Sequence, residues 1–174
     1  MTRVLVLGGA ASGKSAYAES LFETKAQERV YVATAQAFDD EMQAKINAHR
    51  VQRGDAWTTI DAPHQLAERL FELRASRPDA AVLVDCATMW LSNRMLADAD
   101  LEAECTELVA AYRDFEGYLV IVSNEVGQGI VPDNALARRF RNAQGRLNQM
   151  LAAESDHVIA VIAGMPLALK GEVL

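Results

Sequence analysis

The sequence lacks the features that mark several classes of protein. Only two of its 174 residues are cysteines, Cys86 and Cys105. They do not have the spacing of a metal site, so we expect buried, reduced thiols in a cytoplasmic protein. No apolar run approaches the length of a membrane span, and the first residues lack the pattern of a signal peptide. No repeat, low-complexity tract or Gly/Ser-rich linker divides the chain, which predicts a single domain over residues 1–174.

Positive charge is also scarce. The net charge is −7 and the isoelectric point is near 5.0. A nucleic-acid-binding surface needs a basic face to pair with backbone phosphates, so we expect no nucleic acid partner. The acidic balance still allows a nucleotide, because backbone amides and one or two cations can bind its phosphates. The dinucleotide pattern Gly-x-Gly-x-x-Gly is absent, which argues against nicotinamide chemistry.

Strand-like apolar runs alternate with amphipathic segments along the whole chain. This alternation predicts an α/β three-layer fold with a central, mostly parallel sheet flanked by helices, and ligands at the carboxyl ends of the strands. The expected strands are 3–7, 30–33, 57–60, 80–84, 119–122 and 158–162, of which 158–162 should be the last. The expected helices are 15–23, 38–52, 63–73, 101–115 and 134–153. The apolar stripe of 134–153 consists of Leu136, Phe140, Ala143, Leu147 and Leu151.

A phosphate-binding motif follows the first expected strand. It fits G-x-x-x-x-G-K-[ST] without a gap and consists of Gly8, Gly9, Ala10, Ala11, Ser12, Gly13, Lys14 and Ser15. The glycines let backbone N–H groups point inward at phosphate oxygens. Lys14 can reach the β and γ phosphates. A glycine-rich turn that matches by chance is the alternative, but the strand before it and the helix after it favour a P-loop NTPase-type fold.

A magnesium site is expected beside this loop. The Ser15 hydroxyl is the first candidate ligand of Mg²⁺. Asp85, which ends the apolar strand 80–84, is the second, because P-loop folds place an Asp at the end of such a strand. As an alternative, Asp85 could cap the next helix.

Several further stretches follow in order: 31–35 (YVATA), 39–42 (DDEM), 45–50 (KINAHR), 85–93 (DCATMWLSN), 123–132 (SNEVGQGIVP) and 140–149 (FRNAQGRLNQ). In this order and spacing they resemble the bifunctional adenosylcobinamide kinase / adenosylcobinamide-phosphate guanylyltransferase family of cobalamin synthesis. The resemblance covers essentially the whole chain, and residues 124–132 are its most specific part.

The resemblance implies two reactions. In the first, ATP or GTP phosphorylates the aminopropanol hydroxyl of adenosylcobinamide. In the second, GTP gives its GMP part to a histidine, which passes it to adenosylcobinamide phosphate. The family's nucleophile falls at His49. A neutral imidazole, with an unperturbed pKa of about 6.5, is a competent nucleophile near pH 7. Lys14 is the second expected catalytic residue, since with Mg²⁺ it stabilises charge on the phosphates.

The remaining assignments come from the matched stretches. Thr34 and Glu125 are expected to bind the nucleotide, and Asn124 and Glu125 end a strand that faces the site. Two positions depart from the family pattern: Ala11 stands where arginine is common, and Ala48 replaces a second histidine that some relatives carry. The resemblance also implies a homo-oligomer, for which we expect a trimer.

Other functions remain open at this point. The chain could be a plain small-molecule kinase in which His49 is idle, or a nucleotide-binding switch without small-molecule chemistry. The polar strand ends at Asp85, Asn124 and Glu125 favour an enzyme over a switch. The two other histidines, His64 and His157, have no such motif around them and are expected to be surface or packed residues.

Overall fold

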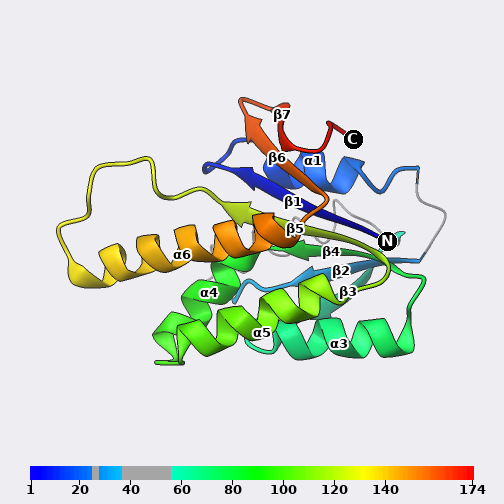
Figure 1. Ribbon diagram of the computed structural model, residues 1–174, viewed down its shortest axis with the longest axis horizontal. Helices are drawn as coiled ribbons and strands as arrows, with labels where there is room; N and C mark the ends of the chain where they lie inside the picture. Colours follow the sequence, from blue (N-terminus) through cyan, green and yellow to red (C-terminus); the bar gives the residue numbers. More distant parts are fainter. Residues whose placement is uncertain (25–27, 37–55) are drawn as a thin grey trace.

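The computed structural model describes residues 1–24, 28–36 and 56–174 and forms an α/β fold (Figure 1). Its strands are β1 (Thr2–Gly8), β2 (Arg29–Ala33), β3 (Thr58–Asp61), β4 (Ala81–Asp85), β5 (Tyr118–Asn124), β6 (His157–Ile162) and β7 (Met165–Lys170). Its helices are α1 (Lys14–Ser20), α3 (Leu66–Ser76), α4 (Ala87–Leu96), α5 (Leu101–Arg113) and α6 (Ala135–Glu154). The helix expected at 38–52 lies outside the described residues. None of the helices described is both long and apolar enough to cross a bilayer.

One seven-stranded sheet has the order β3-β2-β4-β5-β1-β6-β7. Neighbouring strands are parallel from β3 to β6, and only β7 runs antiparallel, beside β6. The predicted mostly parallel sheet is therefore confirmed. Because parallel strands end at the same edge, the segments that follow β1, β2, β3, β4 and β5 all meet there.

Helices cover both faces of the sheet. Figure 1 shows α1 on one side and α3, α5 and α6 on the other. Side chains alternate between the two faces, so in β1 the residue Leu5 packs with the α3–α6 layer while Val4 and Val6 pack with α1. Burial on both faces explains why the central strands read as unbroken apolar runs.

Two elements are absent from the sequence-based expectation. Helix α4 begins at Ala87, directly after Cys86, and packs against β5 and α6. Strand β7 shows that the prediction of 158–162 as the last strand is wrong. Ala163 and Gly164 both have positive φ (52° and 78°), a two-residue turn that returns the chain antiparallel to β6. In α6, the expected stripe begins later than predicted, since Leu136 is 53% exposed whereas Leu147 and Leu151 are buried.

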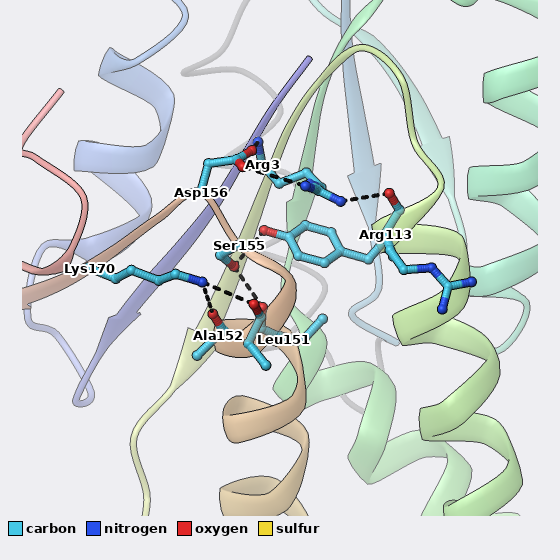
Figure 2. A network of polar contacts seen from close by, with 9 residues as sticks. Arg3, Arg113, Leu151, Ala152, Ser155, Asp156 and Lys170 are labelled. Carbon is cyan, nitrogen blue, oxygen red and sulfur yellow. Dashed lines mark hydrogen bonds and ion pairs between the residues drawn. The ribbon is translucent and has the colours of Figure 1, made fainter.

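Polar contacts connect the elements at the opposite edge of the sheet, where the parallel strands begin (Figure 2). The Arg3 backbone N–H donates to Asp156 Oδ2 at 2.8 Å, and the Arg3 guanidinium lies 3.5 Å from Asp156 Oδ1. Arg3 Nη1 also donates to the carbonyl of Arg113 at 2.7 Å. Partial burial acts to raise the pKa of Asp156, but the hydrogen bonds and charge of Arg3 outweigh it, and the pKa is lowered. The start of β1 is thereby tied to the ends of α5 and α6.

The end of α6 has a second set of contacts in the same view (Figure 2). Lys170 Nζ donates to the carbonyls of Ala152 and Ala153, at 3.1 and 3.0 Å. A cation at a helix C-terminus satisfies carbonyls that have no partner within the helix and complements the helix dipole. The Tyr112 hydroxyl pairs with Ser155 Oγ at 2.8 Å, and burial raises its pKa above the usual range. β7 and α5 thus both fix the position of α6.

Substituting Asp156→Asn tests the ion pair. The folded-state pKa of Asp156 is lowered, so its contribution to stability is present above the unfolded pKa of about 3.9 and is lost as the pH falls through the folded value. We expect the variant to lose about 0.5 kcal/mol of unfolding free energy at pH 7, and the difference from wild type to shrink below pH 4. Denaturant titrations at several pH values measure it. A difference that does not change with pH would show that the charge has no role.

Candidate active site

The sheet register brings three of the expected site segments together. β5 lies between β1 and β4, with Asn124 opposite Gly8 and Val122 opposite Asp85. Val122 belongs to the core on the α1 face, so alternation places Asn124 on the same face. Leu83 belongs to that core too, which places Asp85 on the α1 face by the same rule. The phosphate loop, Asp85 and Asn124 therefore share one edge and one side of the sheet.

Close backbone approaches hold the phosphate loop. A Cβ on Gly8 would lie 2.3 Å from Ser12 Oγ and 2.8 Å from the carbonyl oxygen of Val161, so only glycine fits there. Gly13 has φ +92° and lies against Gly164, whose Cα would be 3.1 Å from an added Cβ. The Gly164 N–H donates to the Ser12 carbonyl at 2.8 Å. The β6–β7 turn thus supports the loop from outside.

Lys14 and Ser15 stand at the start of α1. Lys14 Nζ donates to the Gly9 carbonyl at 3.1 Å, which keeps the ammonium against the loop where phosphates are expected. Ser15 follows in the first turn of α1 and is partly buried. Ser12 Oγ is buried and has no hydrogen-bond partner among the described residues.

Asp85, the last residue of β4, is partly buried. Its Oδ2 accepts a hydrogen bond from the Tyr31 hydroxyl at 2.9 Å. Burial, with a smaller contribution from the charge of Asp85, raises the pKa of the neighbouring Cys86 thiol to about 11, although the charge of Lys14 acts in the opposite direction. Asp85 and Lys14 therefore both act electrostatically on the same buried group. Cys86 stays protonated near pH 7 and is no nucleophile.

Thr34 is fully buried, and its hydroxyl is already occupied. It donates to the Cys86 carbonyl at 2.7 Å and accepts from the Cys86 N–H at 2.8 Å. Asn93 donates to the Thr34 carbonyl at 2.9 Å. The Thr34 hydroxyl thus fixes the chain that follows Asp85. The binding of Thr34 to the nucleotide stays a prediction.

Glu125 connects the phosphate loop to two hollows. Its N–H donates to the Gly8 carbonyl at 3.0 Å, and its Oε1 accepts from the Gly127 N–H at 2.7 Å. A hollow of about 460 Å³ lies between the loop and the β6–β7 turn, and one of about 570 Å³ lies between α6 and β7. Both are lined by Leu7, Glu125, Gln128 and Leu169. Glu125 therefore lies where the phosphate loop meets a groove with a mostly apolar lining.

A comparison with protein families identifies the family of the chain. The model of the family described as "Cobinamide kinase / cobinamide phosphate guanyltransferase" matches residues 4–169. The chain belongs to this family. It is therefore an enzyme.

Full-length relatives support the assignment. The chain is 42% identical to the bifunctional adenosylcobalamin biosynthesis protein CobP of Pseudomonas aeruginosa, over 99% of each chain. It is 38% identical to the corresponding protein CobU of Escherichia coli K12, over 96% of this chain and 99% of that one. Among solved structures, a Pyrococcus horikoshii protein matches with a TM-score of 0.57 and 10% identity, covering 98% of this chain and 86% of that chain. That likeness concerns the fold alone.

Two of the three histidines lie among the described residues. His49 lies outside the described residues. His64 Nε2 lies 2.9 Å from Gln36 Nε2, and its carbonyl accepts from Trp90 Nε1. His157 begins β6 at the opposite edge of the sheet, where its Nδ1 accepts a hydrogen bond from the backbone of Glu172. His64 and His157 are thus both packed against other residues, as expected.

Sequence reasoning assigned no role to a group of buried polar side chains behind the end of β5. They are Thr88, Ser123, Gln144 and Asn148. The available signal was the placement of Gln144 and Asn148 at i and i+4 on the helix face that also carries Leu147 and Leu151. Polar residues in a core-facing stripe require partners inside the protein.

The Gly8→Ala variant tests the close packing of the loop. Its Cβ would collide with the Val161 carbonyl and Ser12, so we expect a loss of about 2 kcal/mol in unfolding free energy and at least tenfold weaker Mg·GTP binding. Gly145→Ala is the control, because its Cβ meets nothing within 4 Å and an added helical Cβ stabilises by about 0.5–1 kcal/mol. Thermal melts and titration calorimetry measure both. Equal behaviour of the two variants would contradict the packing argument.

Proposed function

We propose that the chain phosphorylates adenosylcobinamide with a nucleoside triphosphate and then converts the product to adenosylcobinamide-GDP with GTP, in cobalamin biosynthesis. The family match over residues 4–169 supports this proposal. The observation that carries it is the meeting of the phosphate loop, Asp85 and Asn124 on one face of one sheet edge. Such an edge can bind a triphosphate and orient an acceptor beside it.

The loop and Lys14 would bind the triphosphate. Backbone N–H groups and the ammonium stabilise negative charge on the β and γ oxygens without reorganising during the reaction. The Ser15 hydroxyl and the Asp85 carboxylate are hard oxygen donors that suit Mg²⁺. The Tyr31 hydroxyl, which donates to Oδ2 of Asp85, would help to orient this carboxylate. Two protein ligands and phosphate oxygens are enough, and the described residues contain no larger cluster of potential ligands.

In the kinase step, the aminopropanol hydroxyl oxygen attacks the γ phosphorus. A bond forms between this oxygen and phosphorus while the bond to the β-phosphate oxygen breaks, releasing the nucleoside diphosphate and a proton. Bound Mg²⁺ would neutralise charge on the β and γ phosphates. Glu125, which lines the groove next to the loop, would contact either the nucleotide or the acceptor.

In the transfer step, an imidazole nitrogen of His49 attacks the α phosphorus of GTP and pyrophosphate leaves. A phosphate oxygen of adenosylcobinamide phosphate then attacks the same phosphorus, and the N–P bond breaks to restore the histidine. Splitting one displacement into two gives each step a good nucleophile. The role of His49 rests on the resemblance of residues 45–50 to the family pattern.

The plain kinase stays the second candidate. Every group that it needs lies among the described residues, from Lys14 to Asp85 and Glu125, whereas GMP transfer also needs His49. Membership in an enzyme family favours the bifunctional enzyme or the plain kinase over a nucleotide-binding switch. The homo-oligomer and the cytoplasmic location stay predictions.

Labelling separates the two enzymes. Incubation with Mg²⁺ and GTP labelled at the α phosphate should leave acid-labile, alkali-stable label on the denatured wild-type protein. We expect none on His49→Ala and full label on the control His157→Ala, because His157 lies at the far edge of the sheet. Retention of label by His49→Ala would place the nucleophile elsewhere. No label on any folded, GTP-binding variant would leave the plain kinase.

A further inference from the structure

Strand β5 extends beyond its neighbour at the site. β4 ends with Asp85 opposite Val122, whereas β5 continues for two residues to Asn124. On the other side, Asn124 is opposite Gly8 of β1. The peptide groups of Asn124 that face away from β1 have no strand partner among the residues that the structure describes. Buried peptide groups without partners are costly, so something else must satisfy them.

Two side chains from different helices do so. The N–H of Asn124 donates to Thr88 Oγ1 of α4 at 2.7 Å. The carbonyl of Asn124 accepts from Asn148 Nδ2 of α6 at 3.0 Å. Thr88 and Asn148 therefore replace the missing strand at the last residue of β5.

A second layer of hydrogen bonds holds these two side chains. Ser123 Oγ donates to Asn148 Oδ1 at 2.6 Å, and Thr88 Oγ1 lies 3.4 Å from Ser123 Oγ. Gln144 Nε2 donates to Ser123 Oγ and to Asn148 Oδ1, both at 2.9 Å. We call Thr88, Ser123, Gln144 and Asn148 the β5 clamp. All four are at most 6% exposed.

Packing alone does not account for the clamp. Four polar side chains in an otherwise apolar layer lose their hydration, a cost that apolar side chains of the same volume would avoid. Apolar side chains could not, however, bond to the N–H and carbonyl of Asn124. The clamp therefore fixes the two peptide groups of Asn124, its N–H and its carbonyl.

Asn124 lies in the candidate active site. Because side chains alternate, Ser123 points toward α6 while Asn124 points to the α1 face, which also carries Asp85. The next residue, Glu125, bonds through its N–H to Gly8 at the start of the phosphate loop. A displacement of Asn124 would therefore move the polar groups between the loop and Asp85.

We propose that Thr88 and Asn148 are positioning residues, which act through Asn124 and Glu125 to align the site for phosphoryl transfer. The proposal deepens the proposed function and rests on it for its kinetic test. Phosphate binding itself belongs to the loop and Lys14. Loss of the clamp should therefore lower kcat while leaving nucleotide affinity nearly intact.

Thr88→Val against Thr88→Ser is the test. Valine has nearly the shape of threonine but leaves the Asn124 N–H unpaired, whereas serine keeps the hydroxyl. We expect Thr88→Val to lower kcat for phosphoryl transfer roughly 10- to 100-fold, with the Kd for Mg·GTP changed less than about threefold. Thr88→Ser should stay within about threefold of wild type in both, so that the conservative change rescues the rate.

Tyr112→Phe is the matched stability control. It also deletes a buried hydroxyl, the one bonded to Ser155, but at the opposite edge of the sheet. We expect a lower Tm and an unchanged kcat. If Thr88→Val behaves in the same way, with only its Tm reduced, the clamp is structural and the positioning role is wrong.

Amide hydrogen exchange tests whether the clamp orders Asn124 and Glu125, without relying on enzyme activity. In Thr88→Val, exchange at Asn124 and Glu125 should accelerate at least tenfold relative to Thr88→Ser, while the amides of α3 remain unchanged. Unchanged exchange at Asn124 would overturn the proposal even if the kinetics were altered. If the wild type shows no phosphoryl transfer, the proposed function is wrong. In that case, faster exchange in Thr88→Val with unaltered Mg·GTP binding would show that the clamp orders Asn124 and Glu125 but has no part in phosphoryl transfer.

Discussion

The site depends on how the parallel sheet satisfies its peptide groups where the strands end. The last carbonyl of three strands accepts from the loop that follows a neighbouring strand: Gly8 of β1 from Glu125, Asp85 of β4 from Thr34, and Ala33 of β2 from Ala62. Each loop is thereby fixed to the strand beside it, across the whole edge. An unpaired buried carbonyl costs about as much as a lost hydrogen bond, so the three loops cannot shift independently. This constraint aligns groups that are far apart in the sequence.

The phosphate loop is supported on two sides by this arrangement. Gly8 is held by Glu125, which follows β5, and Ser12 by Gly164 from the β6–β7 turn. Glycine at 8 and 13 allows approaches that a Cβ would prevent. The geometry of the loop backbone is thus set before any ligand binds, which is the condition for strong electrostatic stabilisation by neutral groups. A protein with a net charge of −7 can therefore bind a polyanion with few cations.

Local signals predict the sheet and the loop but not the contacts behind them. The parallel sheet, the loop and the polar strand ends follow from apolar runs and one motif. Helix α4 was missed because only Cys86 separates it from β4 and its first turn contains Thr88 and Trp90, which are weaker helix formers. Strand β7 was missed because Pro166 argues against a strand, although an edge position tolerates it.

The hydrogen bonds of the Thr34 side chain and of the β5 clamp could not be predicted either. They join segments that are far apart in the sequence, and a local sequence pattern does not show which distant residues will meet. His49 lies outside the described residues and stays a motif-based prediction.

One phosphate cradle can serve both proposed reactions. When a hydroxyl attacks the γ phosphorus, negative charge develops on the β phosphate of the departing diphosphate. When a histidine attacks the α phosphorus, charge develops on the β phosphate of the departing pyrophosphate. Lys14 and the loop amides, directed at the β phosphate, would stabilise the leaving group in both cases. The two reactions then differ in the nucleophile and in its direction of approach, while the charge that the protein must stabilise is at the same place. A single domain with one loop is therefore sufficient for two chemistries, provided that acceptor and histidine reach the triphosphate from different sides.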